Sequence, residues 1–192
     1  MDKPARRNRL AAPAAAPALA PGPGAPRLRA QLARLYTRPG FLLRRAHQIA
    51  ASVFEHEARD HGLTPAQFGA LSVVRLLPGM DQSTLARSLG YDKVTTLRVL
   101  RGLEARGLIV RTTAEGSRRN MALRLSMAGQ RLLAQGRKAA DRAGRRVLSP
   151  LSTEEQMQLI ALLKKLTDAL ESQARAPWIS PLAAGKPPRS SP

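Results

Sequence analysis

The chain has 192 residues, of which 43% are hydrophobic and only 3% aromatic, and it carries a formal net charge of +19. This length and composition allow one domain of ordinary size, with a core built mainly from aliphatic side chains. The absence of cysteine excludes disulfides and thiolate metal sites, and the absence of a long uninterrupted apolar run excludes a membrane-spanning helix.

Both ends of the chain are predicted to lie outside the folded core. Residues 1–35 form an Ala-, Pro- and Arg-rich stretch in which repeated prolines interrupt any helix, and we expect this stretch to be a disordered tail. The same prolines argue against a secretory signal, although basic residues precede an alanine-rich segment. Residues 175–192 are also rich in proline and are predicted to form a flexible tail.

The first predicted helix covers residues 41–61, where apolar side chains recur at helical spacing, and it ends at Gly62. We assign residues 36–62 to an N-terminal dimerisation helix. A second helix begins at a capping box formed by Thr64 and Gln67, with a proline in its first turn. It stops at the next Pro-Gly pair.

Two more helices follow and are joined by a tight glycine turn. Asp81 is predicted to cap the third helix, which ends at Leu89, and Gly90 makes the turn. Asp92 is predicted to cap the fourth helix, which Gly107 ends. Four apolar residues are expected to supply the inward stripe of the fourth helix: Val94, Leu97, Leu100 and Leu103.

A β-hairpin is predicted after the fourth helix. Residues 108–113 and 121–126 alternate apolar and polar side chains with a period of two, and residues 114–120 between them contain Gly116. A helix-turn-helix followed by such a hairpin is the winged form of this DNA-binding motif. We therefore expect residues 63–127 to form a DNA-binding lobe.

The last part of the chain predicts two further helices, in residues 127–147 and 153–170, separated by Pro150. We assign residues 128–174 to C-terminal dimerisation helices. Small residues at four-residue spacing in the first of them allow another helix to approach closely, either from the same chain or from a partner: Gly136, Ala140 and Gly144. The predicted fold is mainly α, with about six helices and a small hairpin wing.

The positive charge is concentrated in one third of the chain. Residues 87–146 contain fifteen basic and four acidic residues. Such a local excess indicates a surface that binds a polyanion, and we expect the partner to be double-stranded DNA.

The run DQSTLARSLGYDKVTTLRVLRGLEARGLIVRTTAEGSRRNMALRLSMAGQRLL resembles the DNA-binding core of the MarR family of transcription regulators. The motifs LARSLG, LEARGLI and LRLSMAG carry this resemblance by their order and spacing, and it extends over residues 40–172. It implies an intertwined homodimer that binds a pseudo-palindromic operator. The expected protein is a repressor in the cytoplasm, associated with the nucleoid.

Side chains on the fourth helix are predicted to contact the DNA, because this helix would enter the major groove. Three residues are expected to approach base edges: Thr95, Thr96 and Arg98. Three more are expected to bind phosphates: Arg87, Lys93 and Arg101. The alternative is that these side chains form only the solvated face of an amphipathic helix.

The wing is predicted to place Arg118 and Arg119 in the minor groove, where negative potential is concentrated. By resemblance, family members carry an acidic residue two positions before the wing arginine. Ser117 occupies that place here, so Arg119 lacks this partner and Arg118 is expected to share its role. A plain solvated turn is the alternative.

The resemblance also implies a small-molecule effector, commonly an anionic aromatic compound. His47 is the predicted anchor, with Arg44, Arg45 and Ser72 as polar neighbours for a carboxylate. The segments FLLRRAHQIA and PGMDQSTLA resemble those of a branch of the MarR family that controls the degradation of aromatic acids, including nicotinate. We therefore predict 6-hydroxynicotinate or a related aromatic acid; a structural role of His47 is the alternative.

Other classes of function fit less well. His56 with Asp60 and Glu57 with His61 have a spacing that can hold zinc on a helix, but no thiols accompany them, and we predict neither a metal nor a cofactor. No nucleophile elbow or phosphate-binding glycine loop indicates an enzyme. The remaining rival is a nonspecific architectural DNA-binding protein, which the basic charge alone would allow.

Overall fold

The computed structural model describes residues 25–113 and 121–180. The described elements, in chain order, are α1 (Ala25–Tyr36), α2 (Pro39–Glu57), α3 (Pro65–Leu76), α4 (Gln82–Leu89), α5 (Lys93–Ala105), β1 (Ile109–Thr113), β2 (Met121–Leu125), α6 (Met127–Leu148) and α7 (Thr153–Leu170), with short 3-10 helices at Arg59–His61 and Glu171–Gln173. The chain divides into two compact units, the first ending at Arg45 and the second beginning at Ala46. The mainly helical fold with one antiparallel hairpin confirms the predicted fold class.

Helix α1 is a difference from the sequence-based expectation. The prediction of a disordered tail over residues 1–35 is wrong for residues 25–35, which are helical. No proline occurs between Pro26 and Pro39, and a proline in the first turn of a helix is tolerated. Within the first unit, the rings of Tyr36 and Phe41 lie 5.1 Å apart, centre to centre, and link the end of α1 to α2.

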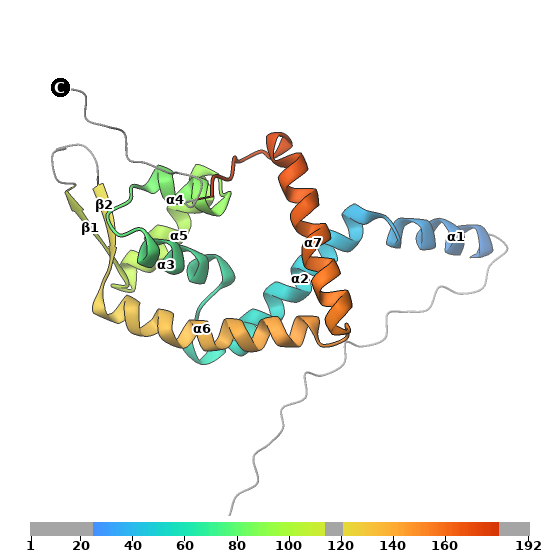
Figure 1. The fold of residues 1–192 in the computed structure, drawn as a ribbon, viewed down its shortest axis with the longest axis horizontal. Helices are drawn as coiled ribbons and strands as arrows, with labels where there is room; N and C mark the ends of the chain where they lie inside the picture. Colours follow the sequence, from blue (N-terminus) through green and yellow to red (C-terminus); the bar gives the residue numbers. More distant parts are fainter. Residues whose placement is uncertain (1–24, 114–120, 181–192) are drawn as a thin grey trace, which may run out of the picture. The chain divides into compact units, whose positions relative to one another are not determined.

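The second unit contains a lobe built from α3, α4, α5, the hairpin and α6. Helix α3 contacts α4, α5, α6 and β2, and Figure 1 shows the three shorter helices packed together beside the hairpin, with α6 running along them. Most of the large side chains that are fully buried are leucines. They come from α3, α4, α5 and β2: Leu71, Leu85, Leu100, Leu103 and Leu123. Aliphatic side chains therefore form the core, as the composition predicts.

Local capping signals fix the ends of these helices. The predicted capping box of α3 is present, since Thr64 Oγ1 accepts a hydrogen bond from the Gln67 N–H at 3.2 Å and the Gln67 side chain accepts one from the Thr64 N–H. The same reciprocal pair forms between Ser152 and Glu155 at the start of α7. These boundaries agree with the sequence because a cap is specified by residues within one turn.

The hairpin pairs Ile109 with Leu125 at its base and Thr113 with Met121 at its outer end. Strand β2 is also bonded to the loop after α3, since the Leu123 N–H donates to Met80 O at 2.8 Å and the Gly79 N–H donates to Leu123 O at 2.9 Å. These bonds anchor the wing to the helix-turn-helix.

The small-residue face of α6 packs on its own chain. Gly136 lies against α3, where a Cβ would come within 2.9 Å of Leu63 Cδ1 and 3.1 Å of Phe68 Cδ2. Ala139 is fully buried on the same face, whereas Gly144 has open space around it. Of the two alternatives left open by the sequence, close approach of a helix of the same chain is the one observed at Gly136.

The C-terminal segment differs from the prediction of a flexible tail over residues 175–192. Residues 174–180, which we call the C-terminal strap, return to the helix-turn-helix, where the Trp178 indole N–H donates to Ser88 O at 3.1 Å. The prediction is therefore wrong for residues 175–180. None of the described helices is long and apolar enough to cross a membrane.

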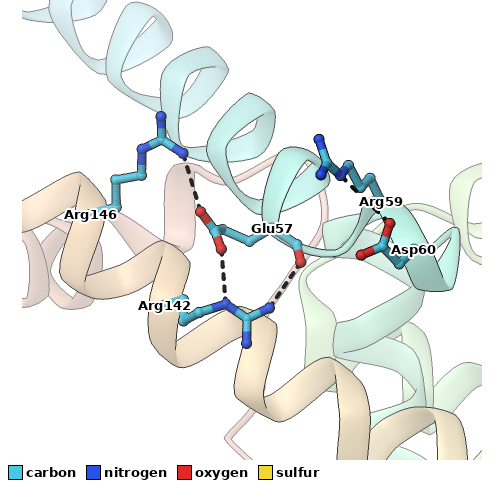
Figure 2. A network of polar contacts seen from close by, with 5 residues as sticks. All are labelled: Glu57, Arg59, Asp60, Arg142 and Arg146. Atoms are coloured by element: carbon cyan, nitrogen blue, oxygen red, sulfur yellow. Dashed lines mark hydrogen bonds and ion pairs between the residues drawn. The ribbon is translucent and has the colours of Figure 1, made fainter. Parts of the chain in front are cut away.

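An ion-pair network joins the end of α2 to α6 (Figure 2). The Glu57 carboxylate accepts a hydrogen bond from Arg142 Nε at 2.9 Å and one from Arg146 Nη1 at 3.1 Å. Arg142 also donates to the backbone carbonyl of Glu57 at 3.1 Å. These bonds, led by the one from Arg142, lower the pKa of Glu57, and partial burial opposes them.

Replacement of Glu57 by glutamine is expected to lower the free energy of unfolding at pH 7 by about 1 kcal/mol, because it removes the charge that two arginines share. Since the pKa of Glu57 is lowered on folding from its ordinary value of 4.5, its stabilisation is present above that pH and is lost as pH falls through the folded-state pKa. Urea denaturation at several pH values should therefore show the difference from wild type shrinking in acid.

The matched control is Asp60→Asn. Asp60 pairs with Arg59 at 3.6 Å, but its side chain is 81% exposed, against 18% for Glu57. We expect a change within about 0.5 kcal/mol at this position. Equal losses for the two variants would contradict the stabilising role of the network.

Candidate DNA-binding surface

Two aspartates and one glycine set the geometry of the helix-turn-helix. Asp81 Oδ1 accepts a hydrogen bond from the Thr84 N–H at 2.7 Å and caps α4. Gly90 ends α4 with φ +64°, a conformation that favours glycine. Asp92 Oδ1 accepts from the Thr95 N–H at 2.7 Å and caps α5. The Thr95 backbone N–H is the main cause of the lowered pKa of Asp92, so this cap stays charged at neutral pH.

The outward face of α5 is defined by residues at positions i, i+4 and i+7. Val94, Arg98 and Arg101 have this spacing and are all exposed. The opposite face is buried at Thr96, Leu100 and Leu103, among other core residues. The helix therefore presents two guanidinium groups and one isopropyl group away from the core.

Two sequence-based assignments on α5 are corrected by this geometry. Thr96 was expected at base edges but is only 1% exposed, and its hydroxyl donates to Asp92 O at 2.8 Å. Val94 was expected in the inward stripe but is 68% exposed. A stripe that starts at Val94 with steps of three and one that starts at Thr96 with steps of four and three both include Leu100 and Leu103. The helical periodicity therefore did not decide between Val94 and Thr96.

Exposed Val94 was therefore missed as a candidate contact. An apolar side chain on the outward face of a groove-binding helix can contact the methyl group of thymine. The signal available in the sequence was its place four residues before Arg98 and seven before Arg101.

The remaining predicted contacts lie around this face. Lys93 is exposed at the first position of α5, and Arg87 is exposed in the last turn of α4. Thr95 is half-buried, and its hydroxyl donates to Asp92 Oδ2 at 3.2 Å, which leaves the hydroxyl oxygen free to accept a further bond. These side chains and the outward face of α5 form one cationic surface.

The wing joins this surface through β1. Arg111 forms an ion pair with Glu104 on α5, and both side chains are 28% exposed. Arg111 therefore ties the wing to α5. Arg118 and Arg119, the predicted minor-groove residues, lie outside the described residues.

The predicted effector residues are only partly brought together. His47 lines a hollow of about 210 Å³ together with small and aromatic side chains from α2, α3 and α6: Ala50, Ala51, Phe54, Pro65, Phe68 and Ala140. Ser72 does not line this hollow, and its hydroxyl donates to Phe68 O at 2.8 Å. Arg44 and Arg45 belong to the other unit, where the Arg44 guanidinium lies 5.2 Å from the centre of the Phe41 ring.

The two carboxylates considered for zinc have other partners. Glu57 is bonded to Arg142 and Arg146, and Asp60 pairs with Arg59. Within the part of the chain that the structure describes, no group of three or more His, Asp or Glu side chains could hold a metal ion.

A capped helix-turn-helix with an outward cationic helix, followed by an anchored hairpin, defines a winged helix-turn-helix DNA-binding protein. Residues 61–120 match the model of the MarR family. A curated relative from Thauera aromatica, named as a candidate transcriptional regulatory protein for the hcr operon, is 39% identical over 131 residues, which cover 66% of this chain and 77% of that protein. The chain belongs to the MarR family and is a transcription regulator.

Two solved structures add context. The transcriptional repressor CouR, bound to a 23-mer DNA duplex, is 32% identical with a TM-score of 0.65, and the match covers 69% of this chain and 94% of that one. BpsR of Bordetella bronchiseptica, whose DNA binding is regulated by 6-hydroxynicotinic acid, is 26% identical with a TM-score of 0.65, over 69% of this chain and 95% of that one.

Proposed function

We propose that the protein is a homodimeric repressor that binds a pseudo-palindromic operator through α5 and releases it when a small aromatic carboxylate binds. The observation that carries the DNA-binding part is the outward face of α5, where Arg98 and Arg101 are exposed beside Lys93 and Val94. The DNA-bound structure of the related repressor CouR supports it.

The contacts divide by chemistry. Arg98, Thr95 and Val94 are proposed to approach base edges, since residues in the N-terminal part of a recognition helix reach furthest into the major groove. Phosphate binding is assigned to three cations around them: Arg87, Lys93 and Arg101. Arg118 and Arg119 are proposed to enter the minor groove from the wing.

Dimerisation is proposed for residues 36–62 and 128–174. Helix α7 exposes a series of large apolar side chains that a monomer would leave in water: Met157, Leu159, Ile160, Leu162, Leu163, Leu166 and Leu170. An apolar surface of this extent indicates a protein interface. A two-fold axis would place the two α5 helices about 34 Å apart, one turn of DNA.

The effector is proposed to bind in the hollow beside His47. Its aromatic side chains Phe54 and Phe68, whose ring centres are 5.4 Å apart, suit a planar ring, and His47 can bind a carboxylate. The regulation of BpsR by 6-hydroxynicotinic acid supports this compound or a related aromatic acid as the effector.

Titration of aromatic acids against a complex with fluorescent operator tests this proposal. We expect 6-hydroxynicotinate or a close relative to lower the anisotropy of wild-type complexes, and we expect His47→Ala to raise the concentration required at least about tenfold, since it removes a charge-assisted bond. Operator affinity without the acid should be unchanged in the variant. Failure of every aromatic acid to release the DNA would contradict the effector proposal.

The second candidate function is nonspecific DNA compaction, which the excess of basic residues between positions 87 and 146 favours. Phosphate contacts alone would bind every duplex with similar affinity. A specific regulator should prefer its operator over a shuffled duplex by about a thousandfold or more.

A further inference from the structure

The C-terminal strap, residues 174–180, is bonded to the last turn of α4. The Ile179 N–H donates to Arg87 O at 2.9 Å, and the Trp178 indole N–H donates to Ser88 O at 3.1 Å. Both acceptors are carbonyls in the last turn of α4, where the usual i+4 donors of a helix run out, although Arg87 O also accepts from the Gly90 N–H at 3.3 Å. The strap therefore acts as a cap for the first helix of the helix-turn-helix.

The strap is also fixed by packing and by its connection to α7. Trp178 Cβ lies 3.5 Å from the position that a Cβ would take at Gly90, so the tryptophan rests on the turn between α4 and α5. The Trp178 backbone N–H donates to Glu171 Oε1 at 2.6 Å, next to the end of α7. Because the C-terminal strap is held both at the Gly90 turn and at Glu171 near the end of α7, the positions of its other residues are restricted as well.

Arg175 is one of the side chains held in this way. It borders a hollow of about 430 Å³ that is also lined by Arg87 and Lys93, so cations from three different segments share one concave surface. The acid in the lining is Asp92, whose carboxylate already accepts bonds from the backbone and hydroxyl of Thr95. Within the described residues, 25–113 and 121–180, neither Lys93 nor Arg175 forms an ion pair.

We propose that Arg175 is a phosphate-binding residue of the DNA interface, held beside Arg87 and Lys93 by the C-terminal strap. The inference rests on the proposed function of α5 and extends the DNA-binding surface to a segment far from it in sequence. Three cations and one carboxylate line this hollow, so its lining carries a net positive charge that attracts a phosphate. The start of α5 borders the same hollow through Lys93 and Asp92, so the positive end of the helix dipole adds to the attraction of an anion.

The test is the salt dependence of DNA binding by the full chain. Affinity for a fluorescent operator and for a shuffled duplex is measured between 50 and about 300 mM salt for wild type and Arg175→Ala, a range in which each phosphate contact adds about 0.9 to the slope of log affinity against log salt. A dimer loses two contacts, so we expect a slope less steep by about two and roughly tenfold weaker binding to both duplexes.

Three further variants make the result specific. Arg175→Lys keeps the charge and should retain the wild-type slope. Trp178→Ala releases the strap and should reproduce the loss seen in Arg175→Ala, whereas Arg29→Ala removes the same charge from an exposed position on α1 and should leave the slope unchanged.

An unchanged slope in Arg175→Ala would overturn the proposal. A gain of affinity in Arg175→Ala or Trp178→Ala would also overturn it, because it would mean that the strap obstructs DNA. A wild-type slope in Trp178→Ala would remove the positioning role of the strap. If the wild-type protein showed no preference for an operator, the proposed function as a specific regulator would be contradicted. The slope of log affinity against log salt, measured on any duplex, would still decide whether Arg175 binds phosphate.

Discussion

Gly129→Ala is expected to destabilise the protein by about 3 kcal/mol, the upper part of the usual range for overpacking. Gly129 lies in the first turn of α6, where a Cβ would stand 2.1 Å from the carbonyl oxygen of Leu108. A backbone atom cannot turn aside as a side chain does, so α6 would have to move away from the start of the wing.

That movement would break a compact set of hydrogen bonds. The Ser126 N–H donates to Leu108 O at 3.1 Å, and the Ser126 hydroxyl donates to Gly107 O at 2.6 Å. Ser126 Oγ also accepts from the Gly129 N–H at 3.0 Å and caps α6. These bonds join α5, the hairpin and α6, so the substitution should also loosen the wing.

Urea denaturation followed by circular dichroism measures the effect. The matched control is Gly144→Ala on the same helix, where nothing lies within 4 Å of the added Cβ. This change should be neutral or stabilise by up to about 1 kcal/mol, because alanine favours the helix. Similar midpoints for the two variants would contradict the close contact at Gly129.

Arg98→Ala is expected to lower the preference for operator over shuffled duplex by about 2 kcal/mol per half-site, or roughly thirtyfold. Arg98 lies on the outward face of α5 in the N-terminal half of the helix, in line with exposed Val94. An arginine in this position can bond two acceptors of a guanine, and removing it takes away sequence discrimination as well as charge.

Arg101→Ala provides the comparison. Arg101 is exposed one turn further along α5, where a groove-binding helix approaches the DNA backbone. We expect this change to weaken both duplexes to a similar extent and to make the salt slope less steep by about two for a dimer. Competition binding with both duplexes measures the two effects, and equal loss of preference in the two variants would contradict the assigned roles.

The sequence predicts the parts of this fold that are specified locally. Helix starts at Thr64, Asp81, Asp92 and Ser152 agree with the structure because each cap depends on residues within one turn. The two strands agree because alternation and a glycine-containing link identify a hairpin.

The errors arise where a local pattern permits more than one arrangement. Leu100 and Leu103 of α5 fit an inward stripe that begins at either Val94 or Thr96, and only packing against α3 and α4 selects Thr96. Helix α1 was missed because the disorder indicated by the prolines up to Pro26 was also predicted for residues 27–35, which contain no proline.

The C-terminal strap could not be predicted from periodicity, because its bonds to α4 join residues about ninety positions apart. One signal was available. Trp178 is the single tryptophan of the chain and stands in a tail otherwise poor in large apolar groups. A large aromatic residue in such a setting indicates a docking site for the tail.

Selection of bound duplexes from a random pool by the 192-residue protein tests most directly whether α5 reads DNA bases. We predict enriched sites with two similar half-sites that are related by a two-fold axis and centred about one turn of DNA apart. We also predict that Arg98→Ala relaxes the sequence at one position in each half-site. Recovery of duplexes without a shared sequence would contradict the claim that α5 reads DNA bases.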